Sequence, residues 1–227
     1  MSWDPIWEGV FRSREWGRYP PEELIRFIAR HFYSVSDRGQ VKILEVGCGA
    51  GANLWYLARE GFDAYGIDGS QTAIVKAERR MQEEGVKAHL QVGDIIRLGE
   101  VYPTGFFDAV IDVACLEHNR MNAIQVILDQ VLLVLKPGGR FFSMMAAVDT
   151  YGAELGKEVE PGTFIDIAEG PVSGIGLCHF FTLEEVQRTF GRFNDVQVEC
   201  SNSSLNSRQQ WFKLWVVEGV KGEVARS

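Results

Sequence analysis

The sequence predicts an α/β fold, a mostly parallel seven-stranded sheet with helices on both faces and an antiparallel hairpin at its C-terminal end. Three observations predict it. Short apolar runs alternate with amphipathic segments from residue 20 to residue 148, which is typical of parallel strands joined by crossover helices. The last two apolar runs, residues 196–200 and 211–218, have no helix between them and should pair antiparallel. With 46% hydrophobic and 24% charged residues, the 227-residue chain has the composition of a globular domain.

The predicted elements follow in order along the chain. A helix begins after Pro20 and Pro21 and runs to about residue 33. Further helices are marked by the apolar residues of 54–58, by the cap Ser70, and by the apolar residues of 124–132. Strands are expected at residues 41–46, 64–67, 88–92, 106–113 and 140–148, the last entered through a tight turn at residues 136–139. Thr182 and Glu185 are spaced as a capping box, which predicts a short helix that Gly191 ends.

Two segments lie outside this alternation within the single domain expected for residues 1–227. Residues 1–20 place five aromatic residues among arginines, which predicts a flap that packs on the core, closes over a site as a lid, or does both. Residues 149–177 fit neither the helical nor the strand period and are rich in glycine and acids. We interpret them as an insertion that caps the substrate space, with Tyr151 and Phe164 as candidate walls.

Composition and charge exclude several classes of partner. The net charge of −8 disfavours binding to nucleic acid and to anionic membranes. No signal peptide is recognisable, and no apolar run is long enough to span a bilayer. The four cysteines form no CxxC-type metal or redox motif. We therefore expect a cytoplasmic protein without a bound metal, in which the cysteines are small core residues.

A glycine-rich turn at residues 47–51 follows the first strand. Glycine allows a sharp turn and close approach of a ligand, and the helix that follows presents free N–H groups. Asp68 comes nineteen residues after Gly49, at the end of the second strand, where a carboxylate can accept hydrogen bonds from both hydroxyls of a ribose. Gly47, Gly49 and Ala52 also satisfy the dinucleotide fingerprint, so the glycines alone fit two classes of cofactor.

Five segments in order resemble the motifs of class I S-adenosylmethionine-dependent methyltransferases. They are EVGCGAG at residues 45–51, GIDGS at 66–70, VGDI at 92–95, FDAVIDVACLEH at 107–118 and LKPGG at 135–139. The resemblance covers residues 41–218. It implies a Rossmann-like sheet that ends in the C-terminal hairpin, S-adenosylmethionine as cofactor and S-adenosylhomocysteine as product.

The resemblance also implies a set of cofactor-binding residues. Asp68 would hold the ribose, Asp94 and Ile95 the adenine, and Val113 and Leu116 would line the methionine side. Arg14 or Arg18 could reach the cofactor carboxylate. The expected set is Trp16, Tyr19, Glu45, Gly47, Gly49, Asn53, Asp68, Gly69, Ser70, Asp94, Ile95, Val113 and Leu116.

His179 is the candidate catalytic residue. It lies between the insertion and the last helix, which should bring it to the rim of the sheet beside the substrate. There it could act as a general base or orient the substrate, or it could pack against the start of the helix. His31 and His89 are expected to be exposed to solvent.

The sequence thus predicts methyl transfer by in-line displacement to an oxygen, nitrogen or carbon atom of a small molecule, by a monomer or homodimer. The DPPY-type tetrapeptide of amino-group DNA methyltransferases is absent, since residues 112–115 read DVAC. Three alternatives stay open: a protein or RNA methyltransferase, a non-catalytic S-adenosylmethionine-binding regulatory protein, and a nicotinamide-dependent oxidoreductase.

Overall fold

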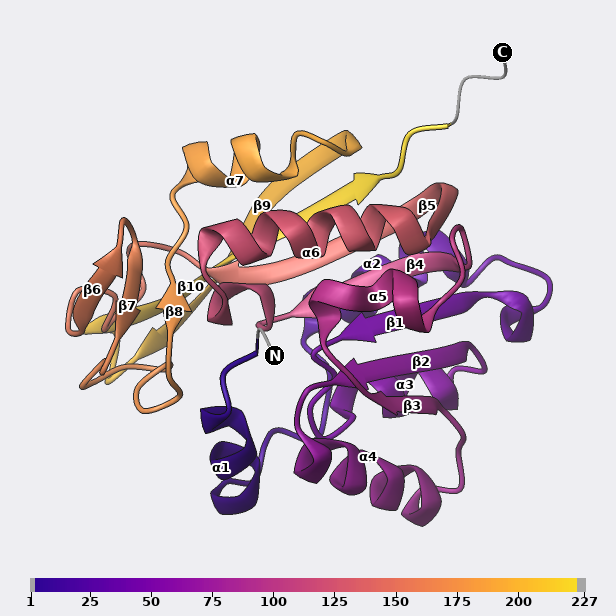
Figure 1. Cartoon of the computed structure of the whole chain (residues 1–227), viewed down its shortest axis with the longest axis horizontal. Helices are drawn as coiled ribbons and strands as arrows, with labels where there is room; N and C mark the ends of the chain where they lie inside the picture. The colour runs from indigo at the N-terminus through magenta and orange to yellow at the C-terminus, as the bar shows by residue number, and fades with distance from the viewer. Residues whose placement is uncertain (1–2, 224–227) are drawn as a thin grey trace.

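The computed structural model describes residues 3–223, so residues 1–2 and 224–227 of the expected domain lie outside the described residues. Its main sheet has seven strands in the order β3-β2-β1-β4-β5-β10-β9 (Figure 1). The first five strands run parallel, whereas β10 is antiparallel to both β5 and β9, which confirms the predicted fold class. The strands are β1 (Lys42–Val46), β2 (Asp63–Asp68), β3 (His89–Val92), β4 (Phe107–Val113), β5 (Leu135–Ala146), β9 (Asn194–Leu205) and β10 (Gln210–Val220).

Helices cover both faces of this sheet because its strands alternate apolar residues between two cores. Within β4, Val110 belongs to one apolar cluster, while Ala109 and Ile111 belong to the other. The helices α5 (Leu98–Val101), α6 (Met121–Val134) and α7 (Leu183–Phe190) contribute to the first cluster. The helices α2 (Glu22–Phe32), α3 (Ala52–Arg59) and α4 (Gln71–Glu83) contribute to the second.

Local signals place the helix starts as predicted. The side chain of Ser70 accepts a hydrogen bond from the backbone of Ala73 and caps α4. Thr182 and Glu185 form the predicted capping box at the start of α7. Short 3₁₀ turns connect other elements: η1 (Arg38–Gln40), η2 (Ile95–Arg97) and η3 (Leu116–His118).

The insertion contains regular structure that its composition hides. It forms a second, antiparallel sheet of β6 (Lys157–Glu160), β7 (Thr163–Ile165) and β8 (Cys178–His179). This small sheet lies beyond the ends of the parallel strands, on the same side as α1 (Ile6–Ser13) (Figure 1). A third apolar cluster joins the two segments, since Val10 of α1 packs with Ile167, Val172 and Ile175.

Four local expectations are corrected by the structure. The hairpin strands extend through most of the polar segment 201–210, and only residues 206–209 form the loop. Residues 136–139 belong to β5, although Gly138 still turns with φ +74°. His31 is only 14% exposed and contacts Glu218 at 2.9 Å. Cys200 is exposed because it lies on the outer hairpin strand, so it is not a core residue.

Within residues 3–223, no helix combines the length and the apolar character that a bilayer crossing requires.

Candidate functional site

A cavity of about 400 Å³ opens where β1 and β4 end. Its floor is the glycine turn and the residues that follow β4. Its walls come from segments far apart in the sequence: Trp3, Trp7, Phe11, Trp16 and Tyr19 from the N-terminal segment, and Pro171, Val172 and Ile175 from the insertion. The flap and the insertion therefore enclose one site together, and the same aromatic residues both pack on the core and cover the cavity.

The glycine turn is closely packed from two sides. Gly47, Gly49 and Gly51 all have positive φ angles, of +66°, +50° and +78°. A Cβ atom on Gly47 would lie 2.2 Å from Sγ of Cys115, and one on Gly49 would lie 3.2 Å from the ring of Phe11. Only glycine fits the conformation and the space at Gly47.

Asp68 ends β2 and fixes the glycine turn. Its carboxylate accepts hydrogen bonds from the backbone N–H groups of Gly49 at 2.9 Å and Ser70 at 2.8 Å. Burial raises the pKa of Asp68, and these two hydrogen bonds oppose that rise. A carboxylate has about four lone-pair sites, so two remain for a ligand in the cavity that Asp68 lines.

Glu45 places a buried carboxyl oxygen without a protein partner at the cavity. Its Oε1 accepts a hydrogen bond from Nδ2 of Asn53 at 2.6 Å, while Oε2 has no hydrogen-bond partner among the described residues. Burial raises the pKa of Glu45 to about 8, and the nearby Asp68 and Asp112 raise it further. Such an oxygen would be satisfied by a cationic or hydrogen-bond-donating group of a ligand.

We expect the free energy of unfolding to fall as pH rises from about 6.5 to 8, because Glu45 and Glu117, both with pKa raised to about 8, hold protons in the folded protein that the unfolded chain has already released. Glu45→Gln should make this fall shallower, since the amide keeps the bond from Asn53 and does not ionise. Urea unfolding at several pH values measures it. Glu184→Gln, at an exposed position of α7, is the matched control, and equal pH dependences in the two variants would contradict the prediction.

Ten of the thirteen expected cofactor-binding residues line the cavity: Trp16, Tyr19, Glu45, Gly47, Gly49, Asn53, Asp68, Gly69, Ile95 and Val113. Ser70, Asp94 and Leu116 do not. Ser70 caps α4 and donates to Glu8, the Asp94 side chain accepts from the backbone of Ile96, and the Leu116 side chain is buried in the core. The structure therefore places these three residues outside the cavity lining.

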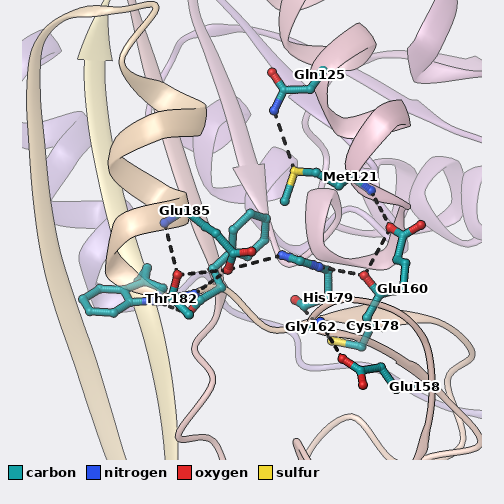
Figure 2. A network of polar contacts seen from close by, with 12 residues as sticks. Met121, Gln125, Glu158, Glu160, Gly162, Cys178, His179, Thr182 and Glu185 are labelled. Atoms are coloured by element: carbon teal, nitrogen blue, oxygen red, sulfur yellow. Dashed lines mark hydrogen bonds and ion pairs between the residues drawn. The ribbon is translucent and has the colours of Figure 1, made fainter.

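His179 also lies away from the cavity. Figure 2 shows its ring in the second sheet, between Glu160 and Glu185. Its Nδ1 is 2.7 Å from Oγ1 of Thr163, its Nε2 is 3.8 Å from Glu185, and the residue is 1% exposed. Because pairing of β8 with β7 turns the imidazole into this network, it does not reach the substrate space as expected.

Four further candidates point elsewhere. Tyr151 and Phe164 do not line the cavity, because the insertion presents Pro171, Val172 and Ile175 instead. Arg14 donates to the carbonyls of Ser173 and Gly174, and Arg18 pairs with Glu84 at the surface, so neither is directed into the cavity.

Two residues without an assigned role in the sequence do line the cavity, Glu117 and His118. Glu117 accepts a hydrogen bond from the backbone of Ala146 at 2.5 Å, and burial raises its pKa to about 8. His118 contacts the carbonyl of Leu177 at 2.8 Å, and burial lowers its pKa to about 4. Their sequence signal is a polar pair a few residues after an apolar strand, where parallel strands carry their site residues.

Helix α1 is held over the glycine turn by an anchor at α4. Glu8 accepts hydrogen bonds from the hydroxyls of Ser70 and Thr72 at the start of α4, and these bonds lower its pKa to about 2. The Trp7 ring then lies edge-on to His118 with 4.7 Å between ring centroids.

Among residues 3–223, no group of three or more His, Cys, Asp and Glu side chains is placed to hold a metal ion.

Comparison with known proteins agrees with this site. A family model described as a methyltransferase domain matches residues 43–139, which include the glycine turn, Asp68 and Glu117. The ubiquinone biosynthesis O-methyltransferase of Paramagnetospirillum magneticum is 30% identical over 147 residues, covering 61% of this chain and 55% of that protein. The Rickettsia canadensis protein of the same name is 34% identical over 118 residues, covering 52% of this chain and 47% of that protein. The chain thus spans about half the length of these curated relatives.

Solved structures share the fold. An S-adenosylmethionine-dependent methyltransferase from Methanosarcina mazei superposes with a TM-score of 0.69 at 24% identity, covering 86% of this chain and 97% of that one. Magnesium protoporphyrin IX methyltransferase from Synechocystis PCC 6803 superposes with a TM-score of 0.65 at 16% identity, covering 88% of this chain and 81% of that one. The chain is thus similar to S-adenosylmethionine-dependent methyltransferases: residues 43–139 match a methyltransferase domain, and the structure shares their fold.

Proposed function

We propose that this protein transfers the methyl group of S-adenosylmethionine to a small-molecule acceptor. The observation that carries the proposal is the cavity at the glycine turn, which Glu45 and Asp68 line while no lysine or arginine lines it among residues 3–223. A cofactor without phosphate groups and with a cationic centre matches this set of groups. When bound, S-adenosylmethionine supplies an electrophilic methyl group on a sulfonium.

The residues present fit that cofactor in detail. Asp68 would accept from the ribose hydroxyls with its two remaining lone-pair sites. Glu45 would satisfy its buried oxygen with the amino group of the methionine moiety. Gly69, Ile95 and Val113 provide apolar walls, and Trp16 and Tyr19 close the cavity from the N-terminal side.

A small acceptor is favoured over a polymer because α1 and the insertion cover the site. The wall contains Asp4, Glu45, Asp68 and Glu117 and no lysine or arginine among the described residues, which disfavours an anionic acceptor. The names of the ubiquinone biosynthesis relatives also support a small molecule and methylation at oxygen. The four free cysteines support a reducing compartment such as the cytoplasm.

Calorimetric titration with S-adenosylmethionine, S-adenosylhomocysteine and NAD tests the proposed cofactor. We expect the first two to bind and NAD not to bind, because a pyrophosphate would meet carboxylates and no basic side chain in this cavity. Binding of NAD alone would overturn the proposal in favour of an oxidoreductase. If S-adenosylmethionine binds, transfer of its labelled methyl group to a panel of small acceptors separates an enzyme from a regulatory binding protein.

A further inference from the structure

The cavity wall holds a carboxyl group and an imidazole side by side directly after β4. Glu117 and His118 both line the cavity, with 3.6 Å between Oε1 of Glu117 and Nε2 of His118. Both residues are buried, and Glu117 is only 1% exposed. The cofactor assignment above gives neither of them a role, so the pair is available to the acceptor.

The contacts of His118 determine which of its nitrogens can accept a proton. Nδ1 lies 2.8 Å from the carbonyl oxygen of Leu177, and a carbonyl oxygen only accepts hydrogen bonds. Nδ1 therefore carries the ring proton, and Nε2 presents a lone pair beside Glu117. With its pKa lowered to about 4 by burial, the imidazole is neutral at neutral pH, so Nε2 keeps its lone pair.

Glu117 is held so that it can support a charge on His118. Its Oε2 accepts a hydrogen bond from the backbone of Ala146, which orients the carboxyl group and leaves Oε1 toward Nε2. An ionised Glu117 would stabilise an imidazolium at this distance. The other titratable groups that face the pair are Asp112 on β4, Asp4 in the N-terminal segment, and the thiols of Cys115 and Cys178.

We propose that Nε2 of His118 accepts the proton of a hydroxyl group on an uncharged phenolic acceptor, with Glu117 as the positioning residue that stabilises the resulting imidazolium. This inference rests on the proposed methyl transfer and narrows its substrate class.

Three features favour an uncharged phenol. A neutral amine attacks through a free lone pair and needs no base before the transfer, whereas a hydroxyl gains nucleophilicity by losing its proton as it attacks. Asp4 and Asp68 line the cavity without any lysine or arginine among the described residues, which opposes an anionic acceptor, and the cationic sulfonium opposes a cationic one. The ring of Trp7 beside His118, and the ring of Phe11 that packs on Trp7, line the cavity and suit a planar aromatic group.

The step balances within the site. The hydroxyl oxygen forms a bond to the methyl carbon as the O–H bond breaks and its proton passes to Nε2. The bond between methyl carbon and sulfur breaks, and its electron pair stays on the sulfur of the leaving S-adenosylhomocysteine. One positive charge is lost at sulfur and one appears on the imidazolium, so the charge of the cavity is unchanged.

The state of His118 can be measured without turnover. In protein labelled with ¹⁵N-histidine and saturated with S-adenosylhomocysteine, we expect the ring nitrogens of His118 to report a neutral imidazole protonated at Nδ1 at pH 7. The uncharged probe methyl 3,4-dihydroxybenzoate should shift the Nε2 resonance. An Nε2-protonated ring or an imidazolium would overturn the proposal, because neither has a lone pair for the acceptor.

Transfer of a labelled methyl group tests the acceptor class with three matched probes. Methyl 3,4-dihydroxybenzoate should be methylated, and its free carboxylate and the diamino analogue methyl 3,4-diaminobenzoate should be poorer acceptors. His118→Gln should lower kcat by about 10²–10⁴-fold while the affinity for S-adenosylmethionine stays within about twofold of wild type. His89→Gln, at an exposed position on β3, is the matched control and should keep the wild-type rate.

Glu117→Gln provides a second variant if His118→Gln does not fold, since the amide oxygen still accepts from Ala146. Glu117→Gln should lower kcat less than His118→Gln does. In the wild-type protein kcat should rise with pH through the range in which Glu117 ionises, and Glu117→Gln should remove this rise. A wild-type rate and pH profile in both variants, or methylation of the diamine in preference to the phenol, would overturn this inference alone, as would the absence of product from all three probes. Failure of S-adenosylmethionine to bind would overturn the proposed function itself.

Discussion

Asp68→Ala should lower the affinity for S-adenosylmethionine by roughly 10²–10⁴-fold. The carboxylate would accept two hydrogen bonds from the ribose, and hydrogen bonds to a charged group contribute about 1.5–3 kcal/mol each. The variant also removes the acceptor of the Gly49 and Ser70 backbone N–H groups, so the glycine turn loses part of its support. Calorimetric titration with S-adenosylmethionine measures the loss of affinity.

Two further variants separate binding from folding. Asp68→Asn keeps the volume of the side chain but replaces one accepting oxygen with an N–H donor, so it should lose most of the affinity at a smaller cost in stability. Asp63→Ala removes a carboxylate at the opposite end of the same strand, where it pairs with Lys42 and does not line the cavity. Wild-type affinity in Asp68→Ala, or an equal loss in Asp63→Ala, would refute the assignment of Asp68 to the ribose.

Gly47→Ala should destabilise the protein by about 2–5 kcal/mol, the sum of a positive φ angle that an L-residue adopts at a cost and overpacking against a neighbour. The added Cβ would lie 2.2 Å from Sγ and 2.5 Å from Cβ of Cys115. Relief of this overlap has to move the residues after β4, and with them Glu117 and His118. Urea unfolding measures the loss in free energy of unfolding. The affinity for S-adenosylmethionine should fall in the same variant.

Gly85→Ala is a matched control for the part of the destabilisation that comes from the positive φ angle. Gly85 has the same φ of +66°, but a Cβ there would meet nothing within 4 Å. Gly85→Ala should therefore lower the free energy of unfolding by only about 1–2 kcal/mol. Cys115→Gly in the Gly47→Ala background should restore part of the difference, because it removes both overlapping atoms. If the two alanine variants lose equal amounts of free energy of unfolding, the overlap with Cys115 does not contribute to the destabilisation.

Local patterns were sufficient to predict most of the main sheet. The central parallel strands are apolar runs buried on both faces, and glycines, prolines and caps mark the ends of the helices between them. The second sheet escaped prediction for a physical reason. Three of the four residues of β6 are charged, and its side chains are exposed or only partly buried. It therefore lacks the alternation of apolar and polar residues that is typical of a half-buried strand.

The residues after β4 show how one backbone angle redirects a site. Ala114 has a φ of +57°, and Asp112 accepts hydrogen bonds from the backbone of Cys115 and Leu116, which turns the chain into η3. This turn buries Leu116 in the core and brings Glu117 and His118 to the cavity. The motif in the sequence indicated this segment but could not show which of its side chains line the cavity.

The sequence by itself determined the alternation of strands and helices, the glycine turn and the position of Asp68, because each depends on residues near in the chain or on a backbone conformation that only glycine adopts. The tertiary structure decided the rest of the site. His118 receives its orientation from Leu177, and His179 is held away from the cavity by Thr163. The aromatic flap meets the insertion about 160 residues later in the chain. Such contacts depend on packing between distant segments, and packing leaves no periodic signal in the residues that take part in it.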